Sequence, residues 1–94
     1  MLHENYGINE NGHLTLCGAD TVMLAKKYGT PLYLMDETLV RERLRMYRKA
    51  TEKYFGNGSG IHYASKALSC KEMYRIAADE HINVDVVSIG ELYT

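Results

Sequence analysis

A lysine at the end of an apolar segment is the residue of this sequence best placed to do chemistry. Ile61–Lys66 is predicted to be a short strand, and Lys66 stands at its carboxyl end, just before a helical segment. Catalytic groups of α/β barrels gather at that end of the strands. A lysine amine forms a Schiff base only when it is neutral, so such a site must lower its pKa by desolvation or nearby positive charge. A solvent-exposed lysine at a strand end is the commoner alternative.

The alternation of side chains along this strand defines the expected neighbours of Lys66. It places His62, Ala64 and Lys66 on one face, and Tyr63 with Ser65 on the other. Ala64 is small, which leaves room beside the lysine stem. No second His, Cys or carboxylate stands at metal-ligand spacing from His62, so we expect no metal site.

An acidic residue interrupts the next apolar segment. Asp85 lies within the predicted strand Asn83–Val87. If this strand neighbours the first one, Asp85 lies near Lys66 and helps to set its charge or orientation. A structural carboxylate bonded to loop amides is an equally good interpretation.

Strands and helices alternate in the second half of the chain. Ser69 and Glu72 form an S-x-x-E capping box, which predicts a helix running to about His81. Ser88 and Glu91 form a second box, so a further helix is expected there. The order strand, helix, strand, helix predicts βαβ units and therefore a parallel sheet in an α/β fold.

The first half of the chain contains shorter elements. Gly12–Leu16 and Pro31–Met35 are predicted to be short strands. Between them, Asp20 is a suitable N-cap for a helix over Thr21–Tyr28, and Gly29 ends it.

A long amphipathic helix joins the two halves. Asp36 can cap it, and it should run to about Phe55, before the glycine-rich loop Gly56–Gly60. Apolar side chains recur at steps of four and three residues, as in a helix with one apolar face. That stripe consists of Val40, Leu44, Tyr47, Thr51 and Tyr54. The basic run Arg41–Lys49 is interleaved with the stripe and flanked by acids, which favours a solvated helix face over a nucleic-acid interface.

Composition excludes several classes of protein. The 94 residues carry a formal net charge of -1, which favours neither nucleic acid nor an anionic membrane as a partner. No apolar run approaches the ~20 residues of a membrane helix, and Met1–Asn5 lacks the basic start of a signal peptide. Cys17 and Cys70 are far apart and form no CxxC pair, so we expect free thiols and a reducing, cytoplasmic compartment.

Three motifs resemble one enzyme family. Tyr63–Ala67 resembles the Tyr-Ala-x-Lys-Ala motif of fold-type III pyridoxal-phosphate (PLP) decarboxylases. Asp85–Ser88 with Gly90–Leu92 is similar to the Asp-Val-x-Ser-Gly-Gly-Glu-Leu segment of the next strand and turn. Leu24–Tyr33 is similar to the segment that leads into the barrel of diaminopimelate decarboxylases. The motifs occur in the family's order and cover nearly the whole chain.

The resemblance implies a cofactor and a reaction. Lys66 would be the catalytic residue that holds PLP, and Ala64 and Asp85 would be further cofactor-binding residues. The complete enzyme would decarboxylate meso-diaminopimelate to L-lysine and CO2, the last step of lysine biosynthesis. Family members are cytoplasmic homodimers that act on amino acids.

The resemblance also implies a fold with two domains. Residues 1–36 would be a segment of a β-rich domain, and residues 37–94 would be the first part of a PLP-binding (βα)8 barrel. A whole barrel takes about 250 residues. We therefore expect an amino-terminal fragment that is inactive and poorly folded by itself, without the family's ring-stacking histidine and phosphate loop.

One position departs from the family pattern, and rival functions stay open. Ile89 stands where the family has the first of two glycines, so it is expected to crowd the turn or to shift it. Another decarboxylase or a racemase of the same fold, acting on ornithine, arginine or alanine, is one alternative. A non-catalytic truncated product is the other.

Overall fold

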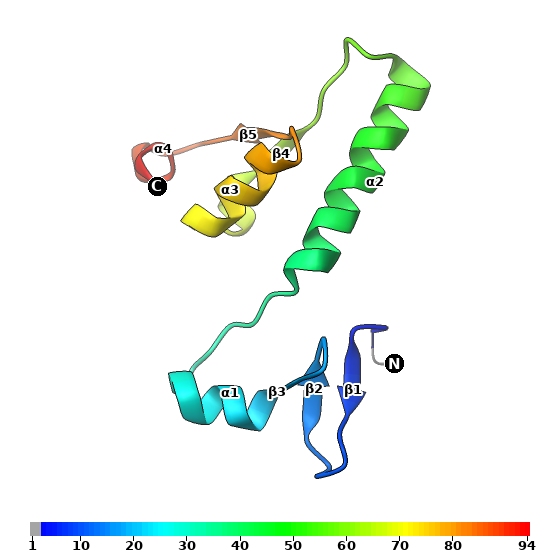
Figure 1. Cartoon of the computed structure of the whole chain (residues 1–94). Coiled ribbons are helices and arrows are strands. Elements are labelled where there is room, and N and C mark those ends of the chain that lie inside the picture. Colours follow the sequence, from blue (N-terminus) through cyan, green and yellow to red (C-terminus); the bar gives the residue numbers. More distant parts are fainter. Residues whose placement is uncertain (1–2) are drawn as a thin grey trace. The chain divides into compact units, whose positions relative to one another are not determined.

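The chain divides at Asp36 into two units, which are described separately (Figure 1). The computed structural model describes residues 3–94. The first unit extends to Asp36 and the second comprises Glu37–Thr94. The division falls where the sequence predicted a change of domain. The assignment of the units to a β domain and to a barrel stays a prediction.

The first unit is a small antiparallel sheet followed by a helix. Its strands β1 (Tyr6–Ile8), β2 (Leu14–Leu16) and β3 (Ala19–Asp20) pair in chain order. Helix α1 (Thr21–Tyr28) ends at Gly29, whose φ of 83° is a conformation that favours glycine. The predicted strand and helix are both confirmed, whereas β1 and β3 were not predicted.

Asp20 holds the start of α1, as predicted. One of its carboxylate oxygens accepts the backbone N–H groups of Val22 and Met23. The other accepts from Asn9 Nδ2 and lies 2.8 Å from His13 Nδ1. The bond to His13 is the main reason that the pKa of Asp20 falls to about 2. The side chain therefore ties the β1–β2 turn to the helix start.

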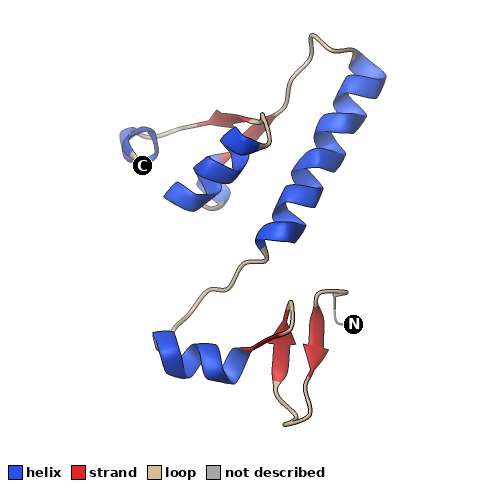
Figure 2. Cartoon of the chain, viewed as in Figure 1, coloured by secondary structure: helices blue, strands red, loops and turns tan. Residues whose placement is uncertain are grey.

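The prediction of a strand over Pro31–Met35 was wrong. This segment is a loop (Figure 2), and the side chain of Tyr33 is 98% exposed. Apolar composition alone does not make a strand, because the backbone must also find a pairing partner. Pro31 has no N–H to donate, and within residues 3–94 no strand pairs with the segment.

The second unit contains helices and two parallel strands. The long helix α2 (Glu37–Phe55) precedes strand β4 (His62–Ala64) and a 3₁₀ turn, η1 (Ser65–Ala67). Helix α3 (Lys71–Asp79) then leads to β5 (Asn83–Asp85), which pairs with β4 in parallel.

The βαβ prediction is confirmed in arrangement and wrong in some boundaries. Both strands are shorter than predicted, so Lys66 lies in η1 and outside the strand. The Ser69–Glu72 capping box does not form. The N-cap of α3 is Cys70, the Ser69 hydroxyl lies 2.7 Å from the Tyr74 hydroxyl, and Glu72 pairs with Arg75.

The core of the second unit is small and centred on α3. Met73, Ile76 and Ala77 form the buried face of this helix, and Ile82 extends the face towards β5. Helix α2 has no fully buried residue, and Tyr47 and Tyr54 of its predicted stripe are exposed. The predicted helix is thus confirmed, but much of its apolar stripe is uncovered within the described part of the chain.

Ion pairs join α2 to the end of α3. Glu80 is only 5% exposed, and its carboxylate accepts from Arg41 Nη1 at 3.1 Å and from Arg45 Nε at 2.8 Å. Arg48 donates to the backbone carbonyl of Glu80 at 2.6 Å. Three arginines of the basic run therefore bind the end of the neighbouring helix, whereas Arg43 and Lys49 are exposed, so the predicted solvated face is confirmed only in part.

The pairing of Glu80 predicts how stability depends on pH. Mainly through Arg45, its pKa is lowered from 4.5 to about 2. Between these values the unfolded chain takes up a proton that the folded chain does not, so stability is lost as pH falls from 4.5 to 2. We expect Glu80→Gln to lower the melting temperature at neutral pH. Between pH 4.5 and 2, the melting temperature of this variant should fall by several degrees less than that of the unmodified protein.

Thermal unfolding followed by circular dichroism at a series of pH values measures this. Glu42→Gln, at an exposed position of α2, is the control and should behave as the unmodified protein. If the melting temperature falls equally in Glu80→Gln and in the unmodified protein, Glu80 is not the source of the acid sensitivity.

Candidate functional site

Lys66 lies in the turn that follows the carboxyl end of β4. Its side chain is exposed, and η1 directs the chain from the strand towards α3. The N–H of Leu68 donates to the carbonyl of Ser65 at 3.2 Å, which closes the turn. Lys66 therefore lies just after the strand, in a 3₁₀ turn, and not at the last position of the strand as predicted.

The two parallel strands have one covered face and one open face. Tyr63 and Val84 are half-buried, whereas the residues before and after each of them are exposed. Ala64 lies opposite Asp85 in the register, so both residues belong to the open face. The predicted neighbourhood of the strands is confirmed. Among residues 3–94 no ion pair joins Lys66 to Asp85, and a role for Asp85 beside the lysine stays a prediction.

A buried serine connects the ends of the two strands. Ser65 is fully buried, and its hydroxyl lies 2.9 Å from the backbone carbonyl of Asp85. The same hydroxyl lies 2.5 Å from Oε1 of Glu91, at the start of helix α4 (Ile89–Tyr93). Because Ser65 precedes Lys66 directly, this contact fixes the backbone from which the lysine side chain leaves.

Glu91 is the centre of the turn between β5 and α4. Its Oε2 accepts the N–H of Val87 at 3.2 Å, and its own N–H donates to the hydroxyl of Ser88 at 3.1 Å. The predicted Ser88–Glu91 capping box is therefore confirmed on its serine side. The bond from Ser65 is the main reason that the pKa of Glu91 is lowered. Ile89, at the position where the family has glycine, is 70% exposed, and its effect on the turn stays a prediction.

Tyr63 supports the same turn from the covered face. Its hydroxyl donates to the backbone carbonyl of Leu68 at 3.0 Å, and burial raises its pKa. The tyrosine thus joins β4 to the residue that follows η1. Both ends of the turn carrying Lys66 are held by side chains.

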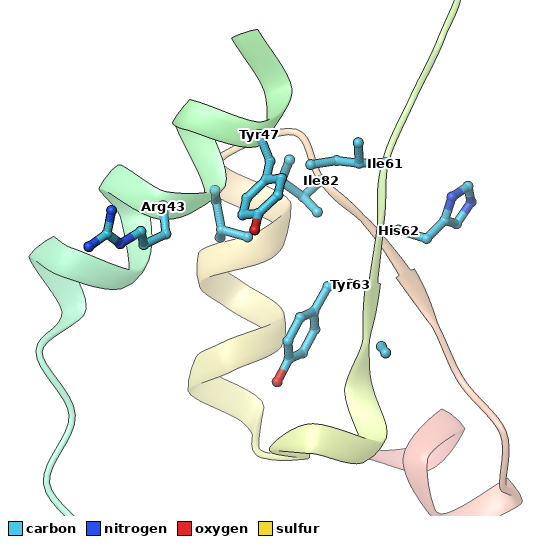
Figure 3. A pocket seen from close by; sticks show the side chains of 8 residues that line it. Arg43, Tyr47, Ile61, His62, Tyr63 and Ile82 are labelled. Atoms are coloured by element: carbon cyan, nitrogen blue, oxygen red, sulfur yellow. The ribbon is translucent and has the colours of Figure 1, made fainter. Parts of the chain in front are cut away.

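A groove of about 520 Å³ lies between α2 and β4, and Lys66 is not among the residues that line it. Figure 3 shows Tyr47 and Tyr63 reaching into it, while His62 points to the other side of β4. The remaining lining residues are Arg43, Leu44, Ile61, Ala64 and Ile82. Most of its lining is apolar, which is typical of a packing surface.

Other kinds of site find no support in the described part of the chain. Residues 3–94 contain no group of three or more His, Cys, Asp or Glu side chains arranged to hold a metal ion. Cys17 and Cys70 are free thiols, and Cys70 is half-buried at the start of α3. No helix in this range is long and apolar enough to cross a membrane.

Sequence reasoning missed the pairing of Ser65 with Glu91. It recognised Glu91 only as a member of a capping box, and Ser65 only as a residue on the face opposite Lys66. One signal could have linked them. Carboxyl ends of neighbouring parallel strands meet at one edge, so a hydroxyl and a carboxylate just after them are brought together.

Curated proteins that are similar to this chain in sequence are named diaminopimelate decarboxylases. A diaminopimelate decarboxylase of Bacillus methanolicus is 47% identical over 98% of this chain, and one of Bacillus subtilis is 45% identical over all of it. The chain is similar to diaminopimelate decarboxylases along its whole length. It spans about a fifth of the length of these relatives, since it covers 21% of each. No family model matches the chain.

A solved structure agrees with the sequence matches. The diaminopimelate decarboxylase of M. jannaschii, determined in complex with L-lysine, is 34% identical and superimposes with a TM-score of 0.75. The match covers 99% of this chain and 22% of that protein. The mixed α/β arrangement of the chain is thus one that a diaminopimelate decarboxylase contains.

The hydrogen bond of Tyr63 predicts a measurable contribution to stability. We expect Tyr63→Phe to lower the free energy of unfolding by about 1 kcal/mol, because the carbonyl of Leu68 loses its donor. Tyr33→Phe, at a side chain that is 98% exposed, is the matched control and should be close to neutral. Urea unfolding measures both variants, and equal midpoints would show that the bond does not hold the turn.

Proposed function

We propose that this chain is part of a PLP-dependent diaminopimelate decarboxylase, which releases CO2 from meso-diaminopimelate and yields L-lysine. The carrying observation is the position of Lys66 at the carboxyl end of β4, in a chain 45–47% identical to diaminopimelate decarboxylases along its length. The co-complex of the M. jannaschii enzyme with L-lysine supports an amino acid as ligand.

The residues around Lys66 fit the attachment of an aldehyde cofactor. The lysine is exposed, so a carbonyl compound can reach its amine. Ala64, on the open face of β4 two residues before Lys66, carries only a methyl group and leaves space at the strand end. Asp85, opposite Ala64, adds a carboxylate to the same face. Lys66, Ala64 and Asp85 are thus the residues of this chain that would hold PLP.

Each of these residues has a distinct role in the proposal. Lys66 would hold the cofactor through its amine, and the amine of the substrate would replace it there. Asp85 favours the protonated state of a nitrogen near it, because a carboxylate stabilises a neighbouring positive charge. PLP, when bound, supplies the electron sink for the electrons left by the departing CO2.

The proposal also assigns the two units to domains. Residues 37–94 form the first part of a (βα)8 barrel, and residues 1–36 form a segment of a β-rich domain. The parallel β4–β5 pair with its connecting helix supports the barrel, and the antiparallel β1–β3 sheet supports the β domain. The open face of β4 and β5 would line the barrel interior. The complete protein is proposed to be a cytoplasmic homodimer.

Covalent mapping tests the assignment of Lys66. In the complete protein loaded with PLP, reduction with borohydride and peptide mapping should place a pyridoxyl group on Lys66. Lys66→Arg should abolish this modification and decarboxylation together, because a guanidinium does not replace the amine. Lys71→Ala, at the exposed start of α3, should retain both. A pyridoxyl group on Lys71, or on no lysine of this chain, would contradict the assignment.

A pH titration tests the role of Asp85. We expect Asp85→Asn to move the midpoint of the lysine-bound cofactor's absorbance change to lower pH by about 0.5 unit or more, because a nearby negative charge is lost. Glu42→Gln should leave the midpoint in place. An unchanged titration in Asp85→Asn would leave this residue with a structural role only.

A further inference from the structure

We propose that Ser65 and Glu91 form a clamp that positions Lys66, and that both are positioning residues for the reaction. This inference rests on the proposed function, since it concerns how the cofactor-bearing lysine is held. The clamp is defined as the Ser65 hydroxyl together with the Glu91 carboxylate.

The burial and contacts of Ser65 support a fixed hydroxyl. The residue is 0% exposed, and its Oγ lies between Glu91 Oε1 at 2.5 Å and the carbonyl oxygen of Asp85 at 2.9 Å. A hydroxyl has one proton, which it shares here between two acceptors. Because Ser65 is buried, water does not compete for its hydroxyl, and a hydroxyl that turned away would lose both contacts.

Glu91 connects the clamp to the neighbouring strand and helix. Besides Ser65 it holds the N–H of Val87, while Ser88 caps its own N–H. The carboxylate thus bridges the turn after β4 and the turn after β5. A shift of η1 would break the bond to Ser65 and disturb the β5–α4 turn at the same time.

The consequence for Lys66 follows from its place in the chain. Ser65 and Lys66 are consecutive residues of one 3₁₀ turn, so fixing the backbone at Ser65 fixes the direction in which the lysine side chain leaves. A lysine stem has four rotatable carbon bonds, and productive geometry tolerates deviations of only about 0.5 Å. A fixed backbone at Ser65 therefore reduces the range of positions that the Lys66 amine can take.

The test uses the complete protein with PLP and the variants Ser65→Ala, Glu91→Gln and their combination, with Glu42→Gln as the matched carboxylate control. Two properties are measured under conditions where each variant is folded by far-ultraviolet circular dichroism. They are the dissociation constant for PLP and the visible circular dichroism per bound cofactor. The second reports how rigidly the cofactor is held on the lysine, and loss of fold stability alone does not change it.

The clamp predicts a coupled loss. Each single variant should bind PLP about tenfold more weakly and lose at least half of the visible circular dichroism signal. In both properties the combined variant should lose no more than the more strongly affected single variant, because both substitutions remove the same interaction. Glu42→Gln should match the unmodified protein.

Three results would overturn the clamp. They are wild-type signals in Ser65→Ala and Glu91→Gln, strictly additive losses in the combination, and failure of both single variants to fold, which would assign the pair to folding alone. The proposed function fails separately, if the unmodified protein does not attach PLP to Lys66.

Discussion

The buried hydroxyl of Ser65 stands where three elements of the second unit meet. It touches the carbonyl at the end of β5 and the carboxylate at the start of α4, while its own backbone begins the turn after β4. Such contacts are possible only because β4 and β5 are parallel, which brings their carboxyl ends to one edge. The parallel register is therefore the constraint on which the site depends. An antiparallel pair would send the two ends to opposite edges.

A second set of contacts holds the helices that flank this edge. Glu80, at the end of α3, is buried beside Arg41 and Arg45 of α2. A buried carboxylate is costly unless it is paired, so the arginines specify where α2 lies against α3. The apolar core of Met73, Ile76, Ala77 and Ile82 is small. The polar contacts of Glu80 therefore add to this small core in holding α2 against α3.

Local signals in the sequence predicted most of the elements. Asp20 and Gly29 mark the ends of α1, and the Ser88–Glu91 spacing marks the start of α4, because capping depends on neighbouring residues only. Pro31–Met35 shows the limit of composition, since a strand also requires a partner that local sequence does not reveal. The role of Arg45 could not be predicted either. Its partner Glu80 lies 35 residues further along the chain, and only the packed structure brings them together.

In the candidate site, too, the sequence predicted local features and missed a contact between distant residues. By resemblance, the motif around Lys66 predicts that this lysine bears the cofactor, which stays a prediction. Strand alternation predicted the face that Ala64 occupies. The contact of Ser65 with Glu91 was missed, because it requires both the parallel pairing of the strands and the exact residue at which η1 begins. A strand continued through Lys66, as first predicted, would have changed the direction of both residues.

An experimental structure of the complete protein with PLP tests the central claim most directly. The account predicts continuous density from Nζ of Lys66 to the cofactor, with the Ser65 hydroxyl within hydrogen-bonding distance of Glu91. Attachment of the cofactor to another lysine would contradict it, as would a Ser65 side chain turned away from Glu91 while the cofactor is bound.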